Sequence, residues 1–164
     1  MKNLALTLAT AAAFSLCIST AEAQRVRGAY ENAAGGVTAG GAHDVRGPWG
    51  GRAVGEGGVV TNGDGAGIGG SRGCAGGAAG GAGCRAGVTT RDEDGNVYHS
   101  DSGYARGAFG NTASTNGSFT RDEDGDLNGE RNSELNVGDR TYTAETTYDS
   151  DDGFNRDVSC SGNC

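Results

Sequence analysis

Apolar residues after residue 23 occur singly or in short groups between glycine-containing turns. The groups are rich in β-branched and aromatic residues, as in Val97-Tyr98, Phe119-Thr120 and Thr141-Tyr142-Thr143, which are typical of β-strands. No stretch after the leader repeats its apolar residues with the 3.6-residue period of a helix. The pattern therefore predicts an all-β chain built from short strands.

A glycine repeat sets the spacing of these strands. Glycine recurs every 15 residues from Gly35 to Gly125 and then at two later positions. The series is Gly35, Gly50, Gly65, Gly80, Gly95, Gly110, Gly125, Gly138 and Gly153. Neighbouring residues differ between alternate units, so the full period is about 30 residues, made of two halves of about 15 residues. The same six residues, Thr-Arg-Asp-Glu-Asp-Gly, end at Gly95 and again at Gly125. Glycine supplies the positive φ of tight hairpins, so the repeat predicts regularly spaced turns.

A second glycine series falls midway between the first: Gly58, Gly73, Gly87, Gly103 and Gly117. If these residues are also turns, one occurs every seven or eight residues and the strands are about five residues long. Two all-β architectures fit this short-strand repeat. One is a β-solenoid whose coils span one half-period or one full period, and the other is an extended antiparallel meander. Residues 62–87 are so rich in glycine that disorder is the alternative for that segment.

The composition argues against a large hydrophobic core. The chain has 164 residues, of which 33 are glycine, and only sixteen Val, Ile, Leu and Phe lie in residues 24–164. As a fraction of the mature chain, these residues reach about half of the value below which a conventional hydrophobic core becomes doubtful. Backbone ladders and stacked small side chains are expected to replace the core, with Tyr98, Tyr104, Phe109 and Tyr142 as its few inward-facing members. Stacking on sugars is the alternative role of these rings.

Residues 1–23 have the features of a signal peptide. Lys2 opens a short positive region, residues 4–18 are mostly apolar, and Ala21 and Ala23 are small residues of the kind that signal peptidase requires. The apolar run is too short for a comfortable membrane span. We therefore expect a mature chain that begins at Gln24 and is secreted to the extracellular space or the periplasm.

Four cysteines remain after the leader: Cys74, Cys84, Cys160 and Cys164. An even number in an exported chain favours disulfides over a metal site. Of the three possible connectivities, the local one closes the shortest loops, pairing Cys74 with Cys84 and Cys160 with Cys164. Closing the loop of about 10 residues at Cys74 is worth about 2–3 kcal/mol in the chain-entropy model.

Charge divides the mature chain into two regions of one continuous repeat domain. The glycine-rich region, residues 24–88, has six arginines against four acids, a net charge of +2. The acidic region, residues 89–164, has six arginines against sixteen acids, a net charge of −10. This balance argues against nucleic acid and anionic membranes as partners, because both require clustered cations. Cations or a cell surface are the partners that it favours, beside self-association.

The acidic turns are candidates for calcium. Asp92 and Asp94 recur one period later as Asp122 and Asp124, and stacked at strand spacing they would repel by about 3 kcal/mol. Ca²⁺ relieves such repulsion because it accepts several oxygen ligands in flexible geometry. The segments partly resemble an EF-hand loop, although Thr90 and Thr120 replace its first ligand, Arg131 replaces the last ligand of the second copy, and no helices flank either loop. The candidate ligands are Asp92, Asp94, Asp101, Asp122, Asp124 and Asp126.

Enzymatic chemistry is not expected. The two histidines, His43 and His99, have no serine or cysteine nucleophile motif around them, and no helix follows the glycine runs to bind phosphate. We expect a secreted structural or surface β-repeat protein that self-assembles into filaments or a matrix. The alternatives are a calcium-stabilised, adhesin-like extracellular binding module and a largely disordered glycine-rich secreted chain. No cofactor other than Ca²⁺ is indicated.

Overall fold

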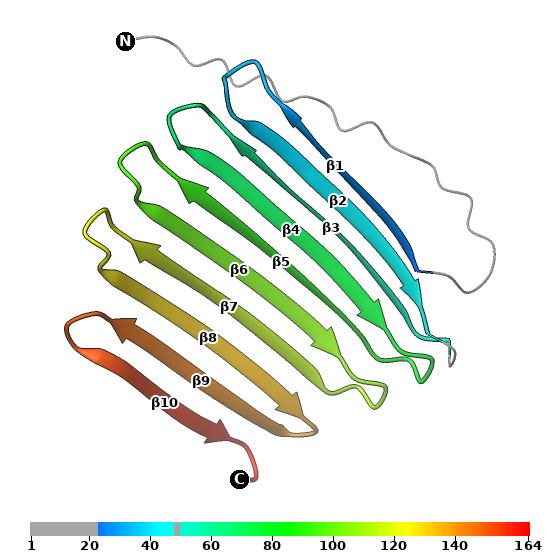
Figure 1. The fold of residues 1–164 in the computed structure, drawn as a ribbon. Helices are drawn as coiled ribbons and strands as arrows, with labels where there is room; N and C mark the ends of the chain where they lie inside the picture. The colour runs from blue at the N-terminus through cyan, green and yellow to red at the C-terminus, as the bar shows by residue number, and fades with distance from the viewer. Residues whose placement is uncertain (1–22, 48–49) are drawn as a thin grey trace.

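The computed structural model describes residues 23–47 and 50–164. These residues form a single sheet of ten antiparallel strands whose spatial order is the order of the sequence (Figure 1). The predicted all-β class and the extended meander are confirmed. The strands are β1 (Gln24–Glu31), β2 (Val37–Arg46), β3 (Arg52–Thr61), β4 (Gly67–Gly76), β5 (Ala82–Arg91), β6 (Val97–Arg106), β7 (Thr112–Arg121), β8 (Leu127–Val137), β9 (Arg140–Asp149) and β10 (Gly153–Ser161).

The first glycine series forms the turns of the meander. Each of its nine members, from Gly35 to Gly153, has a positive φ, between 63° and 98°. In the turn between β5 and β6, for example, Gly95 N donates to Asp92 O (3.3 Å) and Asp92 N donates to Asn96 O (3.1 Å). A three-residue loop with glycine in the left-handed region is a common hairpin connection. The interval between successive turn glycines is therefore one strand plus one turn.

The predicted strand length of about five residues is wrong, because the strands have 8 to 11 residues. The second glycine series lies inside strands and makes no turns. Gly87 of β5 and Gly117 of β7 lie directly opposite Asp101 of β6. A glycine in mid-strand weakens the strand locally, but it leaves room for a large neighbouring side chain to lie across it. In a glycine-rich chain the sequence does not distinguish these two uses of the residue.

The predicted inward-facing aromatic core is also wrong. No apolar side chain of the described residues is buried: Tyr98 is 46% exposed, Tyr104 55% and Phe109, at a turn, 95%. A sheet one layer thick has no interior, so both of its faces meet solvent. Within the described part of the chain, the backbone ladders and the side-chain contacts along each face hold the fold together.

The pairing register assigns every strand residue to one of two faces. Directly opposed residues share a face. The even-numbered residues of β1–β8 and the odd-numbered residues of β9 and β10 therefore form one face, face A, and the remaining strand residues form face B. The parity changes at the short turn around Gly138, where Val137 pairs directly with Arg140.

The expected regional division follows no break in the sheet. The boundary between residues 24–88 and 89–164 falls within β5, whose two halves belong to the same strand. Residues 62–87 contribute the turn at Gly65, all of β4 and the first part of β5, and disorder of this segment in solution stays an alternative to be tested. The predicted leader, residues 1–23, lies outside the described residues except for Ala23.

Candidate functional site

Asp101 has the one buried side chain in the described part of the chain, with 6% of its surface exposed. It lies on face B in the middle of β6, near the centre of the sheet. Gly87 and Gly117 flank it on the two neighbouring strands. A carboxylate shielded in this way must be paired with a cation or hydrogen-bonded, because an isolated buried charge is very costly.

Two arginines reach this carboxylate from different strands. Arg131 of β8 donates from Nη2 to Asp101 Oδ1 (2.7 Å) and from Nη1 to Oδ2 (3.3 Å). Arg131 lies opposite Gly117 of β7, so its side chain crosses the glycine to reach Asp101 two strands away. Arg85 of β5 donates to Asp101 Oδ2 at 3.2 Å from the other side. The two glycines thus provide the space in which the ion cluster forms.

Hydroxyl groups and an aromatic ring extend the cluster. Thr115 Oγ1 accepts a hydrogen bond from Arg131 Nη1 (3.3 Å). Along the same strand as Asp101, His99 Nε2 is 3.7 Å from Asp101 Oδ1, and His99 Nδ1 is 2.7 Å from Thr89 Oγ1. The His99 ring stacks on Phe119 with 5.0 Å between centroids. The resulting network joins four strands, β5 to β8.

The network favours the ionised form of Asp101. The hydrogen bonds from Arg131 lower the pKa of this carboxyl below its ordinary value, although desolvation acts in the opposite direction. Neighbouring side chains cover the Asp101 carboxylate. The side chains of Arg131 and Arg85 themselves remain 42% and 69% exposed. This geometry fixes and neutralises charge across the middle of face B. That the chain is not an enzyme stays an expectation from the sequence.

Asp101 is predicted from the sequence as a candidate calcium ligand, and its arginine partners are not predicted. The repeat contains a signal for this pair, because Asp101 and Arg131 occupy equivalent positions one period apart. Asp101 follows Gly95 by six residues, and Arg131 follows Gly125 by six. In this meander, residues one full period apart lie on the same face two strands apart, about 10 Å from each other. An arginine can cross that distance when the strand between them carries a glycine.

The other candidate calcium ligands lie in the turns at one end of the sheet. Asp92 accepts hydrogen bonds from Asn96 N (2.9 Å) and Asn96 Nδ2 (2.8 Å), and Asp122 accepts one from Asp126 N (2.8 Å). The bond from the Asn96 side chain lowers the pKa of Asp92. Asn96 Oδ1 also accepts from Glu123 N (2.9 Å), which joins the two turns. Asp94 and Asp124 belong to the same two turns.

These turns concentrate negative charge without forming a metal cage. Among residues 23–47 and 50–164, no three His, Cys, Asp or Glu side chains lie together in a way that could hold a metal ion. Asp101 lies on a strand among arginines, apart from the turn carboxylates. Ten acidic residues nevertheless lie in the turns at this end: Asp64, Asp92, Glu93, Asp94, Asp122, Glu123, Asp124, Asp126, Asp151 and Asp152. Calcium binding stays a prediction.

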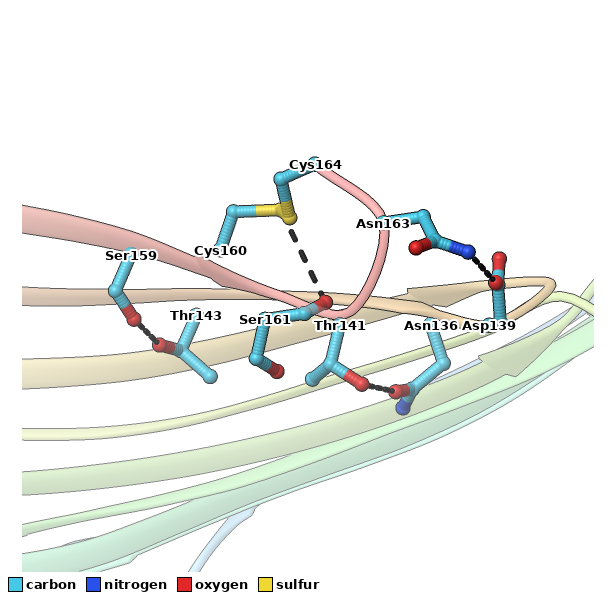
Figure 2. The surroundings of a disulfide bond; sticks show 9 residues. All are labelled: Asn136, Asp139, Thr141, Thr143, Ser159, Cys160, Ser161, Asn163 and Cys164. Atoms are coloured by element: carbon cyan, nitrogen blue, oxygen red, sulfur yellow. Dashed lines mark hydrogen bonds between the residues drawn. A yellow bond between two sulfur atoms is a disulfide. The ribbon is translucent and has the colours of Figure 1, made fainter.

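The cysteines adopt the local pairing. Cys74 and Cys84 lie directly opposite each other on β4 and β5 and form one disulfide, and Cys160 and Cys164 form the other. The second disulfide folds the C-terminus back beside β10, where Asn163 Nδ2 donates to Asp139 Oδ2 (2.6 Å) in the turn between β8 and β9 (Figure 2). Gly162 lies against Asp139 O, where a larger residue would clash. The end of β10 is thereby tied to the neighbouring hairpin.

The two faces of β7–β10 differ sharply in chemistry. Within these four strands, face B has no acidic residue and carries four arginines beside large apolar residues, and face A has no arginine and carries five acids among Ser, Thr and Asn. The arginines are Arg121, Arg131, Arg140 and Arg156; the acids are Glu130, Glu134, Glu145, Asp149 and Asp157. Such alternation is typical of a sheet with one covered and one solvated face. The net charge of this region of the sequence does not show the difference between its two faces.

Both edges of the sheet have backbone groups that find no partner among the residues that the structure describes. Asn32 N donates to Gly36 O (2.9 Å), so the even-numbered residues of β1 bond to β2 and the odd-numbered ones, such as Ala29, turn their N–H and C=O outward. By the same alternation the even-numbered residues of β10, such as Val158, turn theirs outward. Figure 1 shows these two strands at opposite sides of the sheet. Open edges of this kind are templates for pairing with another chain.

The described residues contain no helix with the length and apolar character needed to cross a membrane. No protein-family profile, no curated protein and no solved structure matches the chain.

Proposed function

We propose that the mature chain is a secreted structural protein that self-assembles into a surface layer or extracellular matrix. One observation supports this most directly: the described residues form a sheet one layer thick with two open edges and no buried apolar side chain. A twisted open sheet of ten strands exposes most of its apolar surface as a monomer. Association with further copies covers that surface and pairs the edges.

The edges favour head-to-tail growth. The first half of the mature chain has a net charge of +2 and the second half −10, so pairing β10 of one copy with β1 of the next places the acidic half of one copy beside the arginine-rich half of the next. Because the two pairing surfaces differ, each contact leaves a free edge at both ends, and copies continue to add unless the rotation between them closes a ring. The tie between Asn163 and Asp139 (2.6 Å) holds the end of β10 in the sheet.

The test is the size of the oxidised chain from Gln24 to Cys164 as a function of concentration, by light scattering after size exclusion and by electron microscopy. We expect filaments, sheets or large oligomers. Ala29→Pro removes an outward N–H of β1 and should limit growth, because proline cannot donate to the next strand. Ala29→Val, which keeps the N–H, is the matched control. A wild-type chain that stays monomeric at millimolar concentration would refute the proposal.

A further inference from the structure

We infer that copies of this chain also stack face to face, with face B of one copy on face A of the next, related by translation along the sheet normal. The inference rests on the proposed self-assembly and names the surface that carries it. The occupant of each face is a second copy of the same chain. Size, charge and area support this arrangement separately.

Size complementarity is clearest at β4 and β6. Ile68 projects from face A, 47% exposed, and its chain neighbours Gly67 and Gly69 leave face B smooth behind it. Tyr104, 55% exposed, lies in the same way between Gly103 and Ala105. Because consecutive residues point to opposite faces, a translated copy brings Ile68 and Tyr104 onto glycine or alanine positions of face B.

Charge complementarity is clearest in the second half. Each of the four face B arginines in β7–β10 has an acidic residue next to it in the sequence: Arg121 precedes Asp122, Glu130 precedes Arg131, Asp139 precedes Arg140 and Arg156 precedes Asp157. Glu130 and Asp157 belong to face A, and the other two acids lie in turns. Translation by about 10 Å, the usual spacing of packed sheets, therefore places arginines of one copy over acids of the next.

Packing face B against face B is disfavoured by the same distribution. Over all ten strands face B carries eight arginines and two acids, so two such faces would repel. The area of a face is sufficient for stable stacking. Ten strands about 4.8 Å apart, with ten residues of about 3.4 Å each, cover about 1,600 Å². A standard protein interface buries about 800 Å² per partner.

Two charge reversals on β10 test the stacking. Arg156 on face B and Asp157 on face A are both exposed, so neither change should disturb the fold. In Arg156→Glu both faces are negative at this point, and in Asp157→Arg both are positive. We expect each variant alone to need at least about tenfold more protein for half-assembly, because like charges then meet. An equimolar mixture of the two, and the double variant, should assemble as the wild type does.

A size variant tests the other half of the sheet. Gly69→Phe fills the smooth part of face B; in the chain itself an added Cβ meets its nearest atom, Gly58 O, at 3.4 Å, so the backbone has room for a Cβ there. We expect this variant to keep its far-UV circular dichroism and lose stacking, with Gly69→Ala as the matched control. X-ray scattering from wild-type assemblies should show a spacing of about 10 Å.

The outcomes separate the two proposals. A wild-type chain that never assembles overturns both. Assembly that Ala29→Pro abolishes, but that the charge reversals and Gly69→Phe leave unchanged, overturns face stacking and keeps edge pairing. Variants that stay monomeric alone but recover on mixing support face stacking, because only there do the two altered residues face each other; in edge pairing both would meet the unchanged β1 of the next copy.

Discussion

Replacing Asp101 by asparagine tests whether the central ion cluster holds the sheet together. The substitution keeps the shape of the side chain and removes the charge that pairs with Arg131 and Arg85. Three hydrogen bonds from these arginines, at 2.7, 3.3 and 3.2 Å, lose their charged acceptor. The substitution therefore destabilises the folded state, and the loss should appear as a lower free energy of unfolding.

The expected loss is moderate. A hydrogen bond to a charged group contributes about 1.5–3 kcal/mol when its partner is removed. Because both arginines stay partly solvated, they recover much of this from water, and we expect a total loss of about 2 kcal/mol. With a urea dependence of about 2 kcal/mol/M for a domain of this size, the unfolding midpoint should fall by about 1 M.

The pH dependence provides a second signature. The pKa of Asp101 is lowered in the folded chain from an ordinary value of 3.8. A carboxyl with a lowered pKa stabilises the fold above its unfolded pKa and loses this contribution as pH falls through the folded one. The stability difference between wild type and Asp101→Asn should therefore be constant from pH 7 to 5 and shrink below about pH 4.

Asp44→Asn is the matched control, since Asp44 pairs with Arg52 (2.7 Å) on face A and its side chain is 18% exposed, against 2% for Asp101. We expect a smaller change in the urea midpoint for Asp44→Asn than for Asp101→Asn. Equal midpoints for wild type and Asp101→Asn at pH 7 would refute the idea that the cluster stabilises the sheet. A difference that stayed constant down to pH 3 would refute the role of the ionised carboxylate.

Further predictions concern the turns, the disulfide and the glycine-rich segment. Gly125→Ala, at φ +97°, should cost about 1–2 kcal/mol in urea unfolding, whereas Gly69→Ala, in mid-strand, should not destabilise the chain. Cys74→Ser with Cys84→Ser should cost about 2–3 kcal/mol for a separation of 10 residues, and no change would show that the unfolded chain is already constrained. Amide hydrogen exchange should be slow in β4 (Gly67–Gly76), because its amides are hydrogen-bonded in the sheet. Exchange at random-coil rates there would establish disorder in residues 62–87. If the acidic turns bind Ca²⁺, its addition after EDTA treatment raises the melting temperature; identical melting curves exclude the site.

The turns were the most predictable part of the fold. Only glycine adopts the positive φ of residues such as Gly95 at little cost, so the regular glycine series identified the hairpins. Strand length was not predictable, because Gly87 and Gly117 belong to strands. Gly117 is explained by the side chain of Arg131, which comes from a different repeat, and Gly87 by the side chain of Asp101 on the next strand. A local pattern does not reveal which glycine is crossed by a distant arginine.

The candidate site was harder to predict for a related reason. Asp101 was grouped with Asp92 and Asp94 because they are close in the sequence, but a ten-residue strand carries Asp101 about 15 Å or more from the turn. The single-layer form of the sheet was also not predicted from the sequence. Composition indicated a shortage of core residues, and it did not indicate that Tyr104 and its counterparts would stand on open faces.

The full period of the repeat has a consequence for how such a gene can change. One period encodes two strands and two turns, so gain or loss of a whole period by replication slippage widens or narrows the sheet by about 10 Å. Such a change keeps the acidic turns at one end and preserves the face of every later residue. Loss of a single half-period would instead reverse the direction of all later strands. The width of the sheet can thus vary between related alleles in steps of one period, with each allele still able to fold.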